Sequence, residues 1–473
     1  MPPPDGRGSI ARRSCPSRDR FAEAACRPLI GSSVRIRADA DVRGGRHARV
    51  DGGRLVAALP RGFSPDALRV LAGKSLRAFA DGFVSLLLPV YLLRLGFSAF
   101  AIGSIITSTL VGSALLTLVL GMAAHRYSRR WMLRAACLLM AATGAGFALT
   151  TDYWPIVIVA FVGTMNPSSG DVSVFLPLEQ TVLAETVEPR RRTALFARYS
   201  LFGTLMGAIG TLAAAIPDLL GARLGIGQVS AFRYMFWLYG ALGGVALLLY
   251  RRLSGAVEAP AAAGVSPRAL GESRSIVYGL AALFSLDAFG GGFFVQSLLA
   301  LWLFQAFHLS VPTASAILFW SSVCAALSVL VAVPVSERIG LINTMVFTHL
   351  PSNIFLILVP FAPNLSTAIG LLLARNALSQ MDVPTRTSYV MAVVTPAERP
   401  AAASVTAVPR SLATSVSPIL AGYLLTLSTF GWPLIIGGTL KGVYDVLLLI
   451  KFREVRSVEE RRAGEGPVTT LRS

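Results

Sequence analysis

Carboxylates inside long apolar stretches are the residues of this sequence with the clearest capacity for chemistry. Asp81 and Asp287 each lie within such a stretch, where an ionisable side chain costs at least about 2.5–3.5 kcal/mol on insertion scales. A carboxylate in a partly dry cavity can exchange a proton near neutral pH or bind a cationic substrate. A structural role is the alternative for Asp81, because Arg77 lies one helical turn earlier on the same face. Asp287 has no close basic partner in its own segment, which favours a functional role.

The segments that position these acids alternate with short polar breaks from Leu68 onward. Each is long enough to cross about 30 Å of hydrocarbon as a helix of about 20 residues, and Pro and Gly inside several of them are tolerated in membrane helices. We predict twelve spans, near residues 71–95, 99–122, 131–150, 154–186, 193–217, 231–250, 275–305, 312–335, 342–362, 366–394, 401–427 and 433–451.

Composition agrees with a membrane protein. Only 14% of the 473 residues are charged, against about 25% in soluble domains, and the mean hydropathy is +0.62. The net charge of +18 does not indicate a nucleic-acid partner, because the basic residues lie between apolar segments, as topology signals do. The four cysteines form no CxxC or Cys/His pattern, so we expect no metal site and no disulfide framework. We also expect no cofactor.

The chain divides by composition into two apolar halves and three polar segments. Residues 1–65 are rich in Arg, Pro and Gly and predict a disordered basic tail, with no apolar core of a signal peptide. The predicted units are the tail 1–65, a bundle 66–252, a linker 253–272, a bundle 273–453 and a C-terminal tail 454–473.

Basic residues also predict the orientation. They fall in alternate breaks, with little beyond Arg94 and Arg223 in the others, and Lys and Arg are retained on the cytoplasmic side. We therefore expect both termini in the cytoplasm and a multi-pass protein of the cell (inner) membrane.

The two halves repeat each other weakly, as the halves of many transporters do. Adding 206 to Asp81 gives Asp287. Adding 207 to Pro177, Pro189 and Arg192 gives Pro384, Pro396 and Arg399. Adding 212 to Arg126 gives Arg338. These three matching regions, in order and at nearly constant offset, indicate an internal duplication.

Four more charged residues within the spans are candidates for the site: Glu179, Arg375, Asp382 and Arg386. Glu179 and Arg386 are repeat-related and opposite in sign, so they could neutralise each other between the bundles. The favoured alternative is local pairing, as Arg386 can form with Asp382 at i,i+4. Arg375, Asp382 and Arg386 share one helical face by their spacings of seven and four. Arg375 is a candidate for an anionic substrate group, with pairing to Asp382 or another helix as the alternative, and Gln296 is a candidate to shape the cavity.

Two further i,i+4 pairs, Lys441 with Asp445 and His349 with Asn353, lie in the twelfth and ninth spans. Side chains at this spacing are neighbours on a helix surface. We interpret both as structural pairs that satisfy each other.

A short basic break, Gly121-Met-Ala-Ala-His-Arg-Tyr-Ser-Arg-Arg130, separates the second and third spans. It resembles the pattern Gly-x-x-x-Asp-Arg-x-Gly-Arg-Arg of the major facilitator superfamily, with four matches: Gly121, Arg126, Arg129 and Arg130. His125 replaces the Asp and Ser128 replaces the second Gly. The repeat places a related break at Val333–Ile342. There Glu337 lies at the place of His125, Arg338 lies at the place of Arg126, and Gly340 restores the small residue at the place of Ser128.

The chain from about 68 to 453 therefore resembles a major facilitator. Several stretches are similar to a drug-efflux-like prokaryotic subgroup: Gly340–Asn353, Gln380–Val390 and Lys441–Asp445. The resemblance implies an all-α fold of 12 transmembrane helices in two six-helix bundles with pseudo-twofold symmetry and a central cavity. It also implies that the basic breaks latch the cytoplasmic side. Protonation of His125 beside Arg126 is then expected to loosen that latch as pH falls.

Two departures from drug antiporters weaken the subgroup assignment without affecting the fold. No Pro accompanies Gly203, Gly207 and Gly210 in the fifth span, and the Arg typical of the fourth helix is missing near Met165–Pro167.

The function predicted is secondary active transport by alternating access, as proton-coupled export of a small organic or drug-like molecule by a monomer. The alternatives are uptake or facilitated diffusion of a metabolite, or a sensor or scaffold derived from a transporter that moves nothing. No P-loop motif occurs, which argues against direct ATP drive. No catalytic motif such as Gly-x-Ser-x-Gly or His-Glu-x-x-His is present either, so we do not expect an enzyme.

Overall fold

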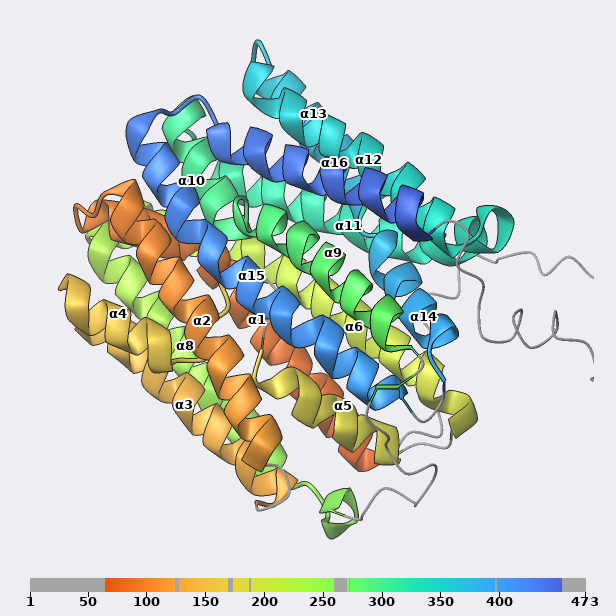
Figure 1. Ribbon diagram of the computed structural model, residues 1–473. Coiled ribbons are helices and arrows are strands. Elements are labelled where there is room, and N and C mark those ends of the chain that lie inside the picture. The colour runs from red at the N-terminus through yellow and green to blue at the C-terminus, as the bar shows by residue number, and fades with distance from the viewer. Residues whose placement is uncertain are drawn as a thin grey trace, which may run out of the picture. The chain divides into compact units, whose positions relative to one another are not determined.

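A computed structural model describes residues 64–123, 127–168, 173–186, 189–258, 270–271, 273–395 and 398–452. This part of the chain is built from helices and short turns and contains no strand, which confirms the predicted all-α class (Figure 1). Most of residues 1–65, the C-terminal tail and much of the linker lie outside the described residues.

Eight α-helices form the N-terminal bundle. They are α1 (Pro65–Arg94), α2 (Ala99–Ala123), α3 (Arg129–Leu149), α4 (Tyr153–Val162), α5 (Phe175–Thr186), α6 (Pro189–Ala213), α7 (Ile216–Leu224) and α8 (Gln228–Arg251). A 3-10 turn, η1 (Gly255–Glu258), follows α8. Local chemistry explains where the first helix begins: the Ser64 side chain accepts the Ala67 N–H at 3.1 Å, and Pro65 takes the first helical position, where its missing N–H costs nothing.

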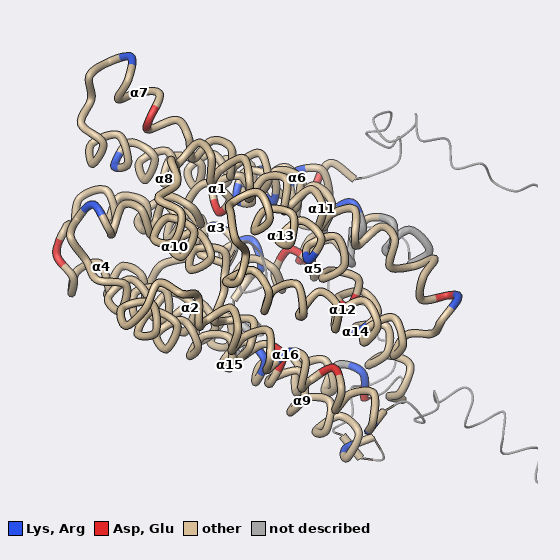
Figure 2. The backbone as a smooth tube through the Cα atoms, turned by 90° about the horizontal axis from the view of Figure 1, so that it is seen from above, with Lys and Arg blue, Asp and Glu red and all other residues tan. Residues whose placement is uncertain are grey.

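Eight further helices form the C-terminal bundle. They are α9 (Arg274–Gly292), α10 (Gln296–Phe307), α11 (Val311–Ile339), α12 (Leu341–Leu358), α13 (Leu365–Ser379), α14 (Asp382–Val393), α15 (Arg399–Leu427) and α16 (Trp432–Phe452), with the 3-10 turn η2 (Val359–Phe361) after α12. Charged positions are sparse along the helical backbone of both bundles (Figure 2).

Each predicted span corresponds to one helix or to two consecutive helices. Within the described residues, nine segments are long and apolar enough to cross a membrane by themselves. The other predicted spans are the interrupted pairs α4–α5 and α13–α14, and α15, whose Ser, Thr, Pro and Arg lower its hydropathy.

Three predicted spans are interrupted, and in the fourth the polar run that begins at Asn166 already predicts an interruption. The fourth breaks between Val162 and Phe175, the seventh between Gly292 and Gln296, and the tenth at Gln380–Met381. The first break contains Gly163 and Pro167, and the second follows three consecutive glycines. Backbone freed from helical hydrogen bonds at membrane depth must be satisfied by protein or water, so these breaks mark places where other groups converge.

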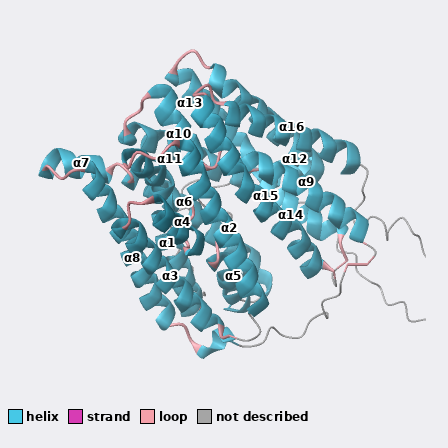
Figure 3. Cartoon of the chain, turned by 60° about the vertical axis from the view of Figure 1, so that its left-hand side comes forward, coloured by secondary structure: helices cyan, strands magenta, loops and turns pink. Residues whose placement is uncertain are grey.

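We call the end of the molecule where α1 begins and α16 ends the terminal end, and the other the opposite end. The two bundles are joined at the opposite end (Figure 3). Here α2 meets α15 through glycines. A Cβ on Gly103 would lie 2.5 Å from the Pro418 carbonyl oxygen and 2.9 Å from Gly422 Cα, so only glycine permits this backbone approach.

Hydrogen bonds reinforce the same junction. The Phe100 N–H donates to Thr426 Oγ1 at 3.0 Å, and Ser297 Oγ donates to the Ser85 carbonyl at 2.6 Å. Toward the terminal end, Leu118 on α2 and Leu412 on α15 are 41% and 42% exposed. The bundles are therefore closed against each other at the opposite end.

Candidate functional site

A buried carboxylate, Glu179 on α5, organises the charged residues of the N-terminal bundle. Its Oε1 accepts hydrogen bonds from Arg77 on α1 and from Tyr250 at the end of α8. Its Oε2 accepts the Tyr199 hydroxyl from α6 at 2.6 Å. Glu179 is 0% exposed, so four helices converge on one ionised group whose charge is balanced by Arg77. We call Arg77, Glu179, Tyr199 and Tyr250 the N-terminal charge cluster.

Arg77 is further held by an aromatic face. Its guanidinium carbon lies 3.9 Å from the centre of the Phe175 ring, a cation–π contact that gains strength where water is excluded. The predicted alternative of an Arg77–Asp81 pair is therefore wrong, because Arg77 is committed to Glu179.

Asp81 lies one turn beyond Arg77 on α1 and is half-buried. In the part of the chain that the structure describes, Asp81 forms no ion pair. Arg77 and Lys74 are the positive charges that act on it from a distance, and the backbone of Asn166, in the break between α4 and α5, lies beside it. Asp81 is thus a carboxylate without a bonded counter-ion.

The C-terminal bundle holds a second buried cluster, centred on Asp287 of α9. Arg386 Nη2 on α14 lies 2.8 Å from Asp287 Oδ2, and Lys441 on α16 bonds the other oxygen. Arg386 also bonds Asp382, one turn earlier on α14. We call Asp287, Asp382, Arg386 and Lys441 the C-terminal charge cluster. The cations that Asp287 lacks in its own helix come from two other helices.

This cluster continues into α12 through His349, whose Nε2 lies 4.0 Å from Asp287 Oδ1. His349 Nδ1 lies 2.9 Å from Asp445 Oδ1 on α16, and Asn353 Nδ2 donates to Asp445 Oδ2 at 2.8 Å. The predicted contact between His349 and Asn353 is present, at 3.3 Å. The predicted Lys441–Asp445 pair is wrong, because Lys441 reaches across to Asp287 instead.

Two other predictions about paired charges have definite outcomes. The Glu179–Arg386 pair between bundles does not form here, since each residue is bonded within its own bundle. The local Asp382–Arg386 pair is confirmed. Arg375 does not share one continuous helix with these residues, because the break at Gln380–Met381 places it on α13 and them on α14.

Arg375 is half-buried and lies beside the break between α9 and α10. Its guanidinium carbon is 4.8 Å from the centre of the Phe294 ring, and Nη1 donates to Asn376 Oδ1 at 3.0 Å. Its Nε has no hydrogen-bond partner, and within the described ranges the side chain forms no ion pair. Arg375 is therefore a cation with donors available to a ligand.

Gln296 begins α10 at the contact between the bundles. Its Nε2 lies 3.5 Å from Thr211 Oγ1 on α6. The backbone N–H of the next residue, Ser297, donates to Pro167 O at 3.3 Å, in the break between α4 and α5. Two helix breaks thus meet beside Asp81 and Arg375.

We call the residues of the two basic breaks that are predicted to latch the cytoplasmic side the gate residues. The structure describes only some of them. His125 and Arg126 lie outside the described residues, and of Gly121 only the backbone, in the last turn of α2, is described. Arg129 and Arg130 begin α3, where their backbone N–H groups donate to Glu258 of η1 at 2.9 and 3.0 Å. Arg130 Nε adds a contact of 3.2 Å to the same carboxylate.

The related break contains Glu337 and Arg338 in the last turn of α11, both exposed. Gly340 has φ +84° and links α11 to α12, a backbone conformation that favours glycine. The small residue expected at this place is thus required by the turn between the two helices.

Glu258 was not singled out from the sequence. A helix that begins with two arginines opposes its own macrodipole, so an acid was needed near that end. Partial burial disfavours the charge of Glu258, but the hydrogen bonds from the backbone of Arg130 and Arg129 and the ion pair with Arg130 outweigh it. Together they lower its pKa below the ordinary value of 4.5.

The tyrosines of the N-terminal charge cluster were also missed. The signal that could have indicated them is a general one: a buried tyrosine hydroxyl needs a hydrogen-bond partner. Only the fold shows that Tyr199 and Tyr250 share Glu179.

Together, two helical bundles closed at one end, with interrupted helices and half-buried charges where they meet, define a membrane transporter of small molecules. The family model described as the Major Facilitator Superfamily matches residues 70–295 and 280–472. The chain belongs to this superfamily.

Relatives and solved structures agree with this fold. The chain is 23% identical over 422 residues to "Uncharacterized membrane protein YJR124C" of Saccharomyces cerevisiae, covering 82% of this chain and 94% of the relative. The nucleoside transporter NupG has a TM-score of 0.62 at 15% identity, covering 81% of this chain and 98% of its own.

Two further structures are similar. A bacterial homolog of the human lysosomal transporter Spinster, in an inward-facing and occupied conformation, has a TM-score of 0.63 at 14% identity, covering 84% and 99% of the two chains. The human organic anion transporter MFSD10 (TETRAN) has a TM-score of 0.58 at 16% identity, covering 81% and 99%. These similarities define the fold.

Proposed function

We propose that this chain is a proton-coupled secondary transporter that works by alternating access and exports a small organic or drug-like molecule. Asp81 is the observation that carries the proposal. It is a half-buried carboxylate on α1 with no bonded counter-ion in the described structure. Such a group can take up and release a proton as its access to water changes.

The other buried acids of the site support this assignment by contrast. Glu179 is bonded to Arg77, and Asp287 to Arg386 and Lys441. Removing the charge of either acid leaves its bonded cations uncompensated in a dry environment, which is strongly unfavourable. Protonation of Asp81 carries no such penalty. Asp287 remains a candidate for a later step, if a conformational change separates it from its cations.

The closed opposite end supports the direction. With both termini in the cytoplasm, as the basic breaks predict, the Gly103–Gly422 contact closes the external side. Substrate then enters from the cytoplasm, which is the loading state of an exporter. The predicted cytoplasmic termini, the inner membrane and the monomeric state are part of the same proposal.

The side chains of the site also indicate what kind of molecule is transported. Asp81 offers a negative charge, Arg375 offers unused donors beside Phe294, and Gln296 lies between the bundles. This set suits a small organic molecule with both polar and aromatic groups. A first panel should contain cationic drugs, as the resemblance to drug-efflux-like proteins suggests, together with nucleosides and organic anions, after the names of NupG and MFSD10.

The experiment is transport by the purified protein in proteoliposomes of defined pH gradient. We expect Asp81→Asn to lose gradient-driven accumulation while substrate exchange at equal concentrations continues, because exchange needs the cavity but not the proton. Asp81→Glu keeps the carboxylate and should retain part of the coupling. Asp152→Asn, the same change at an exposed residue before α4, is the control.

The outcomes separate the alternatives. Full coupling in Asp81→Asn would reject the role of Asp81. Flux of substrate down its own gradient that is independent of pH in the wild type would instead favour facilitated diffusion. Terminal tags that report an external C-terminus would reject the orientation on which export depends.

A further inference from the structure

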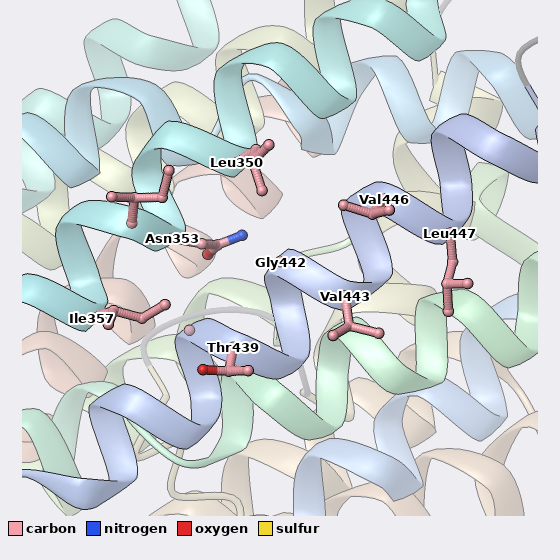
Figure 4. Close-up of a pocket in the computed structure, with 10 residues that line it drawn as sticks. Leu350, Asn353, Ile357, Thr439, Gly442, Val443, Val446 and Leu447 are labelled. Carbon is pink, nitrogen blue, oxygen red and sulfur yellow. The ribbon is translucent and has the colours of Figure 1, made fainter.

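A groove runs between α12 and α16 on the outer surface of the C-terminal bundle (Figure 4). Its volume is about 390 Å³, within the range of about 300–1,000 Å³ typical of small-molecule sites. The floor is low where α16 has Gly438 and Gly442, and branched apolar side chains form the walls. We call it the α12–α16 groove.

The groove faces the surroundings of the helices and not the contact between bundles. Its wall residues Ile354, Val443, Val446 and Leu447 are 49%, 45%, 46% and 42% exposed, although all are large and apolar. Both α12 and α16 are long and apolar enough to span a membrane. In a transporter such a surface is in contact with lipid hydrocarbon, so molecules dissolved in the bilayer have direct access to the groove.

Two polar residues, Asn353 and Thr439, line this otherwise apolar groove. The Thr439 hydroxyl donates to the Ile435 carbonyl of its own helix at 2.8 Å, whereas Asn353 is not fully paired. Asn353 is only 1% exposed. Its Nδ2 donates to Asp445 Oδ2 at 2.8 Å, whereas its Oδ1 is buried and has no hydrogen-bond partner. A buried acceptor without a donor is expensive in hydrocarbon, where no water can replace the missing bond.

The orientation of the Asn353 amide is fixed by its neighbour. A carboxylate only accepts hydrogen bonds, so the amide must present nitrogen to Asp445. His349 Nδ1, which also lies 2.9 Å from Asp445 Oδ1, holds that carboxylate in place. The amide oxygen cannot be satisfied by flipping the side chain, and it remains a fixed acceptor.

We propose that the α12–α16 groove binds a small, uncharged, mainly apolar molecule from the bilayer that donates one O–H or N–H hydrogen bond to Asn353 Oδ1. The apolar walls bury its hydrocarbon part, and the unpaired acceptor of Asn353 selects its polar group. Lipid headgroups are excluded by depth, because the groove begins at Gly438, about 9 Å along the helix from Trp432 at the start of α16. This binding does not depend on the identity of the transported cargo.

The experiment uses the full-length protein in lipid nanodiscs and a pair of photoactivatable probes. One probe is a long-chain primary alcohol with a diazirine in its alkyl chain, and the other is its methyl ether, which has the same hydrocarbon but cannot donate. We expect the alcohol to label α12 and α16 peptides at about tenfold lower concentration than the ether, the value of one hydrogen bond to a buried acceptor. Labelled peptides are identified by mass spectrometry.

A pair of variants tests the location. A Cβ on Gly442 would meet Leu350 Cδ1 at 3.8 Å, an ordinary contact, so Gly442→Leu fills the groove without displacing backbone. It should reduce labelling by the alcohol at least about fivefold. Gly370→Leu is the control, because it makes the same change at an exposed site on α13 where an added Cβ meets nothing within 4 Å.

Three results would overturn the proposal. Equal labelling by alcohol and ether would mean that plain hydrocarbon fills the groove. Unchanged labelling in Gly442→Leu would place the probe elsewhere. Cross-links between two copies of the chain through α12 and α16, with exclusion of the alcohol, would show that a second copy covers this face.

Discussion

The guanidinium of Arg386 on α14 lies 2.8 Å from the carboxylate of Asp287 on α9, and this ion pair has a counterpart of reversed polarity in the other bundle. There Arg77 on α1 supplies the cation and Glu179 on α5 supplies the anion. In both bundles the pair joins the first span of the repeat to the second half of an interrupted fourth span. The duplication thus preserves a buried charge pair at corresponding helices while exchanging its sign.

Each bundle therefore contains its own buried ion pair, Arg77–Glu179 in one and Arg386–Asp287 in the other. We call each pair the internal lock of its bundle. Glu179 and Arg386 are repeat-related and opposite in sign, yet each is neutralised by a partner in its own bundle. Buried pairs of this kind contribute little net stability, but leaving one member unpaired is costly. We therefore interpret them as features that keep each bundle rigid while the bundles move against each other.

The first prediction concerns the lock of the N-terminal bundle. Glu179→Gln should destabilise the protein by about 3–5 kcal/mol, because it leaves Arg77 charged and unpaired among four helices. The double variant Arg77→Met, Glu179→Leu removes both charges and should be more stable than either Glu179→Gln or Arg77→Met alone. Thermal unfolding in detergent of these variants provides the comparison. A double variant with the summed loss of two independent single variants would contradict the lock.

The second prediction distinguishes the observed partner of Lys441 from the one its sequence spacing indicates. Lys441 bonds Asp287 on α9, although Asp445 lies one turn away on its own helix. A double-mutant cycle of Lys441→Met with Asp287→Asn should give a coupling free energy of about 1–3 kcal/mol. The cycle with Asp445→Asn should give a smaller value. Equal coupling to both acids would mean that the lysine divides its charge between them.

Much of the fold follows from the sequence because the membrane fixes the length of each element. The first predicted span, 71–95, corresponds to α1 at Pro65–Arg94, and the last, 433–451, to α16 at Trp432–Phe452. The interruptions of the seventh and tenth spans could not be placed, since Pro and Gly occur in both continuous and broken membrane helices. Pro89 lies inside the continuous α1, whereas Pro167 lies in a break.

The candidate site was predictable only where partners are near in sequence. Asp382 and Arg386 are one turn apart, and their contact follows from helical geometry. Arg77 and Glu179 are 102 residues apart, and their contact depends on how α1 and α5 pack. The sequence therefore identified the charged residues of the clusters but not the two tyrosines, and it assigned partners wrongly for Arg77 and Lys441.

The third prediction concerns Glu258, which caps α3 and pairs with Arg130. Glu258→Gln should destabilise the protein by about 1–2 kcal/mol at pH 7, because it removes a capping carboxylate from the positive end of a helix. Glu337→Gln is the matched control, since Glu337 is exposed near the end of α11.

The pH dependence of this effect has a definite sign. The pKa of Glu258 is lower in the folded protein than its ordinary value of 4.5, so its contribution is fully present above pH 4.5. The contribution is lost as pH falls through the folded value, where the carboxylate takes up a proton. The difference in melting temperature between wild type and Glu258→Gln should therefore shrink below pH 4.5. A difference that grows in acid would show that Glu258 acts in another way.

The fourth prediction tests the glycine contact that closes the opposite end. Gly103→Leu places a side chain where the Pro418 carbonyl oxygen already lies 2.5 Å from an added Cβ, so α2 and α15 cannot approach as closely. The equilibrium should shift toward the state in which the opposite end is open and the terminal end is closed. Spin labels at Leu118→Cys and Leu412→Cys, on the terminal-end halves of α2 and α15, should then move closer together.

Gly244→Leu provides the control for this shift, because an added Cβ at that position on α8 meets nothing within 4 Å. If close packing of Gly103 against Gly422 is what closes the opposite end, only the variant at Gly103 should change the distance distribution. Gly103→Ala should give a smaller shift than Gly103→Leu, since a single methyl group leaves room for the helices to separate slightly and remain in contact. A distribution unchanged in Gly103→Leu would mean that the hydrogen bonds of Phe100 and Ser297 close this end without the glycines.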